Sequence, residues 1–236
     1  MTFRPLQTLI SKNRIQFLML GIILVGFLGT FVLLTHSNPS IFERFLGELN
    51  PLVIAISIAI IAIATLSLLL SSRRLPIYKK TAPMVFFRYT PLVTLFVCVA
   101  IWVDWNIVYP ADIHILLPES LLFYPAMGFL VEIAFHALPL TILLFIFPFV
   151  FKTLKYRTIV WLSIIIVALL EPTYQIFMDT YPSWALLTVW LNLFLFNIVQ
   201  LYVFKVYGFI NMYGLRLVYY LFWHIIWGSL RLELLL

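Results

Sequence analysis

The 236-residue chain has few charged residues and a single cysteine. Asp, Glu, Lys and Arg make up 10% of the sequence, whereas a soluble domain carries about 25%. Hydrophobic residues make up 64%, and the mean hydropathy is +1.10. These values exclude both a soluble monomer and a disordered chain. One cysteine cannot form a disulfide framework, and because Cys98 lies in an apolar run we expect its side chain to pack in the core.

Several motifs that carry well-known chemistry are also missing. The sequence has only eight glycines and no GxxxG pair, which argues against helix dimerisation through glycine-lined faces. It has no glycine-rich phosphate loop, no CxxC pair, no nucleophile elbow and no zinc-protease helix with two histidines around a glutamate. Any chemistry must therefore come from polar residues that are dispersed along the chain.

What the chain has instead is long apolar runs. Crossing about 30 Å of hydrocarbon takes roughly 20 mostly apolar residues in a helix. The sequence offers seven such stretches, at about 15–35, 52–71, 84–103, 121–151, 158–178, 184–204 and 209–230. We therefore predict an all-α polytopic transmembrane helix bundle, with residues 1–236 forming one integral-membrane domain.

The fourth stretch is longer than a bilayer requires. It contains Pro139 and Pro148, and a proline inside a helix removes a backbone donor. These prolines suggest a kink or a break into two pieces, and a strong tilt of the helix is the alternative.

The charges orient the bundle, because basic residues are retained on the cytoplasmic side. The segments before the first span and after the second, fourth and sixth spans carry 11 of the 15 basic residues. These are Arg4, Lys12, Arg14, Arg73, Arg74, Lys79, Lys80, Lys152, Lys155, Arg157 and Lys205. The alternate loops carry Glu43, Glu48, Asp104, Asp112, Glu119 and Asp179, with Arg44 as their one basic residue.

This pattern predicts a multi-pass protein of the cell (inner) membrane with a cytoplasmic N-terminus and an outer C-terminus. Basic loops beside an anionic leaflet account for the net charge of +6, so the lipid bilayer is the expected partner and no nucleic acid is needed.

The predicted spans contain a few polar residues, which are candidates for function because each ionisable side chain costs about 2.5–3.5 kcal/mol to insert. Glu132 and His136 share one helix face, and so do Glu171 and Gln175. The other candidates are Asn192, Asn197 and Gln200 in the sixth span and Arg216 and His224 in the seventh.

Counting residues from the outer boundary places Glu171 and His224 at similar depth, about 10 Å below it. Such a pair could hydrogen-bond, could bind a metal with Glu132 or His136, or could activate a water. Zinc is the metal to test. Structural interpretations stand beside these: a Glu132–Arg216 salt bridge, interhelical hydrogen bonds from Asn197 and Gln200, and solvated outer-loop positions for His36 and His114.

The last 65 residues or so resemble the CPBP family of intramembrane glutamic proteases, which includes CAAX prenyl endopeptidases and bacterial abortive-infection proteins. Three segments carry the resemblance. Glu171-Pro-Thr-Tyr-Gln175 stands where the family has paired glutamates and an arginine. Phe196-Asn-Ile-Val-Gln200 stands at the FxxxH motif, and His224-Ile-Ile-Trp-Gly228 at the closing HxxxN motif.

The resemblance implies that Glu171 activates a water and that His224 stabilises the oxyanion, with Gln200 at the middle motif and a membrane-embedded peptide as substrate. The chain departs from the pattern: one glutamate is absent, glutamines replace the arginine and the middle histidine, and a glycine replaces the asparagine. Glutamine can hydrogen-bond a water but cannot take its proton. Glu132 and His136 could substitute for the missing groups.

Three functions stay open at this point. The chain could be an intramembrane peptidase, or a diverged, inactive member of that family. It could be a non-catalytic subunit or assembly factor that binds a partner membrane protein. It could also be a small-molecule or proton-coupled transporter, although the absence of repeats disfavours this.

Overall fold

The computed structural model describes residues 11–80, 82–178 and 181–235. Within these residues the chain forms helices and connecting turns and contains no strand, so the all-α prediction is confirmed. Arg4 and Asp179, which contributed to the charge pattern, lie outside the described residues.

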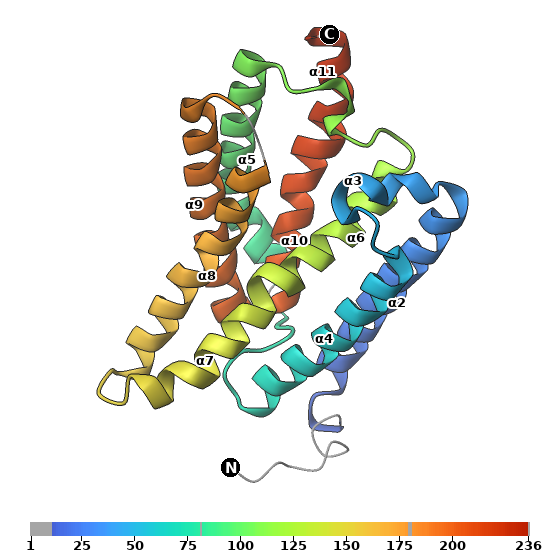
Figure 1. The fold of residues 1–236 in the computed structure, drawn as a ribbon. Helices are drawn as coiled ribbons and strands as arrows, with labels where there is room; N and C mark the ends of the chain where they lie inside the picture. The colour runs from blue at the N-terminus through green and yellow to red at the C-terminus, as the bar shows by residue number, and fades with distance from the viewer. Residues whose placement is uncertain (1–10, 81, 179–180, 236) are drawn as a thin grey trace.

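The described helices follow one another along the chain (Figure 1). The α-helices are α2 Arg14–Ser37, α3 Glu43–Leu46, α4 Pro51–Ser71, α5 Ala82–Ile107, α6 Ser120–Val131, α7 Leu138–Val150, α8 Tyr156–Met178, α9 Ser183–Tyr207, α10 Phe209–Tyr220 and α11 Gly228–Leu234. Two π-helical turns, Glu132–Ala137 and Leu221–Trp227, join α6 to α7 and α10 to α11. Short 3₁₀ turns occupy Pro39–Phe42 and Ala111–Ile113.

Six helices of the described chain are long and apolar enough to cross a membrane, and they match the first six predicted stretches. The predicted seventh, 209–230, is helical as well, but it consists of α10, the π-turn and α11 in succession. Figure 1 shows this last segment running beside α5 and α9. The chain is therefore a polytopic helix bundle.

The fourth stretch forms 31 consecutive helical residues, Ser120–Val150, and its π-turn lies near the middle. Figure 1 shows this segment crossing the molecule diagonally without a sharp bend. Pro139 lies two residues after the end of the π-turn and lacks the N–H that an α-helix would donate to Phe135. The segment is therefore continuous, and the proline lies near a π-helical widening of the helix instead of a break.

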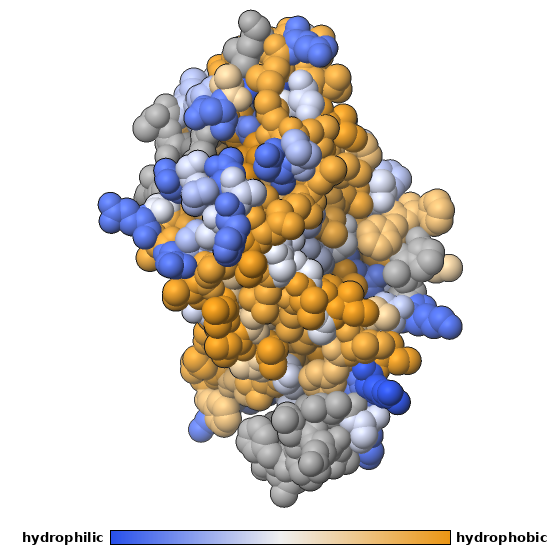
Figure 2. Space-filling model, turned by 90° about the vertical axis from the view of Figure 1, so that its right-hand side faces the viewer, coloured by the Kyte–Doolittle hydropathy of each residue, from blue (hydrophilic) through white to orange (hydrophobic). Residues whose placement is uncertain are grey.

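The surface of the bundle is that of a lipid-facing protein. Val25, Met84, Phe87 and Phe149 are each more than 70% exposed. Figure 2 shows hydrophobic residues dominating the middle of one face, with hydrophilic residues in its upper part and at its lower end. Cys98 is exposed on α5, so its predicted core position is wrong. In a membrane protein an apolar run has lipid on one side, and hydropathy alone does not say which side.

The turn between α9 and α10 depends on a glycine. Gly208 has φ +98°, and a β-carbon there would lie 2.9 Å from the carbonyl oxygen of Ile77. This close approach lets the first N–H groups of α10 reach the segment before α5: Phe209 donates to Pro76 O and Ile210 to Ile77 O. These bonds satisfy helix-end donors that have no partner within α10.

We expect Gly208→Ala to destabilise the fold by ~1–3 kcal/mol, because alanine at this φ is strained and its β-carbon meets backbone. Detergent-solubilised protein unfolded by heat or by sodium dodecyl sulfate provides the measurement. Gly26→Ala is the matched control, since a β-carbon there has no atom within 4 Å. Equal stability of the two variants would refute this role of Gly208.

Candidate functional site: a buried glutamate, histidine and arginine cluster

The π-turn between α6 and α7 carries two of the predicted site residues. Glu132 and His136 are both 0% exposed, and Glu132 Oε2 lies 3.0 Å from His136 Nδ1. They share a face of the helix, as predicted from their spacing. Single π-turns inside α-helices occur frequently at functional sites, because the added residue rotates side chains out of the regular register.

Arg216 on α10 is the centre of the cluster. Its Nε donates to Glu132 Oε1 at 2.7 Å, and its Nη1 and Nη2 donate to the two carboxylate oxygens of Glu171 at 2.7 and 2.8 Å. Nη2 also donates to Gln200 Oε1 at 2.9 Å. The Glu132–Arg216 salt bridge is therefore confirmed. One guanidinium joins the π-turn, α8, α9 and α10, and its fork geometry suits a bidentate carboxylate.

Gln200 and Asn197 extend the cluster along α9. Gln200 Nε2 donates to Glu132 Oε1 at 2.6 Å, so Gln200 contacts the carboxylate and the guanidinium at once. Asn197 Nδ2 donates to the backbone oxygen of Ala168 at 3.3 Å. That oxygen has no partner four residues on, because Pro172 carries no N–H. Asn197 thus supplies the donor that Ala168 O would otherwise lack, about one helical turn before Glu171.

His136 lies between the two carboxylates. Its Nε2 is 3.6 Å from Glu171 Oε2, on the opposite side of the ring from Glu132. Neither ring nitrogen makes a hydrogen bond of good geometry, and neither does Glu132 Oε2. Most buried polar atoms in proteins are hydrogen-bonded, so those that are not need an explanation, and a catalytic role is one. In this cluster such atoms belong to His136 and Glu132, whereas each guanidinium nitrogen of Arg216 has a partner.

His224 is not part of this cluster. Its Nδ1 lies 3.1 Å from Nδ1 of His114, and its ring stacks on Tyr124 with centroids 4.2 Å apart. The structure therefore does not form the expected Glu171–His224 pair. The expected solvation of His114 is also wrong, since this residue is 4% exposed. A β-carbon at Gly228 would lie 3.0 Å from His114, so a glycine there leaves space for this ring.

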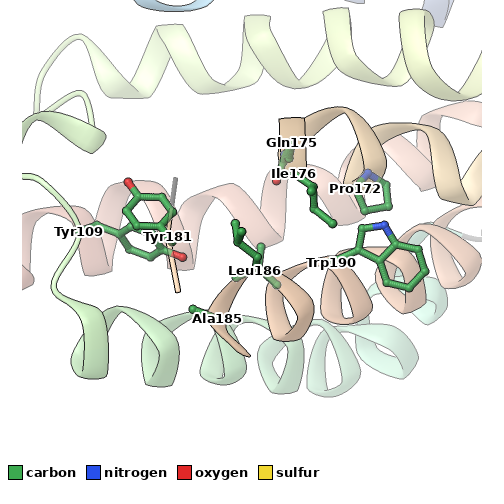
Figure 3. Close-up of a pocket in the computed structure, with 9 residues that line it drawn as sticks. Tyr109, Pro172, Gln175, Ile176, Tyr181, Ala185, Leu186 and Trp190 are labelled. Carbon is green, nitrogen blue, oxygen red and sulfur yellow. The ribbon is translucent and has the colours of Figure 1, made fainter. Parts of the chain in front are cut away.

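Gln175 lies outside the cluster too. It is partly buried and lines a small pocket between the C-terminal end of α8 and the N-terminal end of α9, together with Pro172 and Trp190 (Figure 3). The pocket holds about 10 Å³, room for roughly one water. Because Pro172 directly follows Glu171, this pocket begins one residue away from the cluster.

A second buried ion pair was missed by the sequence analysis. Arg231 donates to both oxygens of Asp104, at 2.7 and 2.9 Å, and Trp227 Nε1 donates to Asp104 Oδ2 at 2.6 Å. Arg231 also reaches the backbone oxygens of Tyr109 and Pro110. Asp104 is 0% exposed, so its placement in an outer loop was wrong. The spacing of Trp227 and Arg231, four residues apart, puts two hydrogen-bond donors on one helix face. This spacing is the feature of the sequence that could have predicted a buried acceptor such as Asp104.

In the described residues no group of three or more His, Cys, Asp and Glu side chains is arranged to hold a metal ion. In the cluster, the guanidinium of Arg216 occupies both carboxylate oxygens of Glu171 and Oε1 of Glu132.

Compared with known proteins, the chain matches no protein-family model, and no curated protein or solved structure matches it significantly.

The role of Asn197 can be tested with a double-mutant cycle. We expect Asn197→Ala to cost ~1–3 kcal/mol of unfolding free energy, because Ala168 O loses its donor. In a Pro172→Ala background the cost should fall by about 1 kcal/mol, since the new N–H can bond Ala168 O. Asn192→Ala, which removes a donor to Phe96 O, is the control and should cost the same in both backgrounds. Equal costs for Asn197→Ala in the two backgrounds would contradict this role.

Proposed function

We propose that this polytopic membrane protein is an intramembrane hydrolase that cleaves a membrane-embedded peptide bond, with Glu171 and His136 as its acid–base pair. One observation carries the proposal. The buried ring of His136 lies 3.0 and 3.6 Å from the carboxylates of two different helices, yet its nitrogens make no hydrogen bond of good geometry.

The cluster also contains the types of side chain that are missing from the CPBP-like motifs of this sequence. In sequence order the chain lacks the second glutamate, the arginine and the middle histidine of that family. In space, Glu132, Arg216 and His136 lie around Glu171 and Gln200. The same set of side chains is thus gathered from different positions of the chain, which supports a glutamate and histidine hydrolase.

A structural role alone explains this cluster less well. Burying ion pairs in place of well-packed apolar side chains is often neutral or destabilising, because desolvation offsets the attraction. Four ionisable side chains at one buried point are therefore an inefficient way to hold helices together. Ionisable residues inside membrane spans are functional candidates by default for this reason.

In the proposed reaction, the Glu171 carboxylate takes a proton from water as the water oxygen attacks the peptide carbonyl carbon. Arg216 holds Glu171 through both oxygens and so fixes its orientation. The proton then passes from Glu171 through His136, whose Nε2 lies 3.6 Å from Glu171 Oε2, to the amide nitrogen as the carbon–nitrogen bond breaks. The products are a carboxylic acid and an amine, and both side chains return to their starting state, so protons and bonds balance.

The test uses purified protein in lipid vesicles with two fluorophore–quencher probes, a prenylated peptide and a transmembrane peptide. We expect cleavage of at least one probe, and a loss of about 10²-fold or more in Glu171→Gln and His136→Gln, the usual contribution of an acid or base. His36→Gln is the matched control, because His36 is exposed at the end of α2.

Cleavage of neither probe by the wild-type protein, or unchanged cleavage in Glu171→Gln, would contradict the proposal. His224→Gln identifies the histidine involved. Full activity in this variant agrees with the geometry, whereas its loss alongside full activity of His136→Gln would assign the chemistry to the residue that the resemblance selects.

A second candidate, a non-catalytic membrane subunit, is favoured by one observation: all three nitrogens of Arg216 already have carboxylate or amide partners. For this candidate we expect no cleavage and a partner that co-purifies in mild detergent. We also expect the partner to be lost when Arg216→Gln loosens the helices.

A further inference from the structure

A groove of about 510 Å³ opens where α4 ends, beside the start of α2 and the end of α9. Five cationic side chains line it: Lys12, Arg73, Arg74, Lys79 and Lys205. They come from three separate parts of the chain. Among the described residues that line this groove none is acidic, so its positive charge is not compensated.

The segment between α4 and α5, which contributes Pro76 and Lys79 to the groove, is hydrogen-bonded on two sides. The side chain of Gln16 on α2 accepts hydrogen bonds from the backbone of Ile77 and Tyr78, at 2.8 and 3.1 Å. From the other side, α10 donates to the carbonyl oxygens of Pro76 and Ile77. The segment that carries the basic residues between α4 and α5 is therefore ordered before any ligand binds, which lowers the entropic cost of binding.

Three of the five cations are positioned by neutral groups. Arg74 donates to Leu144 O and lies 4.3 Å from the centroid of the Phe145 ring. Lys79 Nζ donates to Val206 O at 2.6 Å. Lys205 Nζ lies 4.4 Å from the centroid of the Trp161 ring. Carbonyl oxygens and aromatic rings fix these side chains without neutralising their charge.

Arg73 is an exposed cation at the end of α4. It has φ +55°, in the left-handed region where a helix end usually carries glycine. An arginine at such a position costs backbone energy, and residues held in this way occur at binding sites. Retention of basic residues on the cytoplasmic side explains their presence near the helix ends, but it does not explain their convergence on one concave surface.

From this charge, shape and position we infer that the groove binds the phosphate of an anionic membrane lipid such as phosphatidylglycerol. The groove lies at the ends of membrane-spanning helices, where lipid head groups lie, and the partly exposed Leu70 in its wall offers apolar surface to the lipid. Basic pockets between transmembrane helices on the cytoplasmic side bind phosphate head groups. This site is separate from the buried cluster and does not rest on the proposed function.

Native mass spectrometry of the detergent-solubilised full-length protein tests the inference, with phosphatidylglycerol and phosphatidylcholine as probes. We expect preferential retention of phosphatidylglycerol that weakens as salt is raised. In the double variant Lys12→Gln/Arg73→Gln, which spares the three positioned cations, we expect about 25-fold weaker phosphatidylglycerol binding, from about fivefold per cation.

The matched control is Lys152→Gln/Lys155→Gln, which removes the same charge from exposed residues of the α7–α8 connection. It should bind phosphatidylglycerol like the wild-type protein. Equal binding of the two lipids by the wild-type protein, or an equal loss in the control variant, would overturn the inference. Displacement of the lipid by inorganic phosphate would also overturn it, because the site would then recognise a free anion. The comparison of lipids needs no variant and so does not depend on how the substitutions fold.

Discussion

The structure depends on one guanidinium that is shared by two buried carboxylates. Arg216 enters the bundle on α10 and meets Glu132 from the π-turn, Glu171 from α8 and Gln200 from α9. Removing one partner of a buried ion pair is costly, because the other charge is left without compensation in a medium of low dielectric. The positions of four helical segments are therefore coupled through this side chain, and the placement of His136 between the carboxylates follows from it.

Much of this could be predicted from the sequence, because the cost of inserting polar groups into hydrocarbon leaves few alternatives. Apolar run lengths located the helices to within about one turn. The few polar residues inside those runs, Glu132, His136, Glu171, Gln200 and Arg216, had to meet each other or water, and they do meet. The resemblance to CPBP proteases rests on the segments Glu171–Gln175, Phe196–Gln200 and His224–Gly228, which share only Glu171 and Gln200 with this set, and it stays a prediction.

The contacts between residues far apart in the sequence could not be predicted, because hydropathy describes each segment alone and does not say which segments pack together. The predicted spans end at 103 and 230, so they exclude Asp104 and Arg231 by one residue each. The two residues are nevertheless buried, because they form an ion pair with each other. His114 was assigned to solvent because its loop is polar, whereas it packs against His224 and the open side of Gly228. That contact is made by residues more than 100 positions apart, and it withdraws His224 from Glu171.

The sharing of Arg216 by two carboxylates tests this account most directly. We expect Arg216→Gln to cost about 3–5 kcal/mol of unfolding free energy, because it leaves both Glu132 and Glu171 buried without a counter-charge. In a Glu132→Gln/Glu171→Gln background the cost of Arg216→Gln should be smaller, since the two carboxylate charges that it compensates are gone. An equal cost of Arg216→Gln in the two backgrounds, measured by unfolding of the detergent-solubilised protein, would contradict the account.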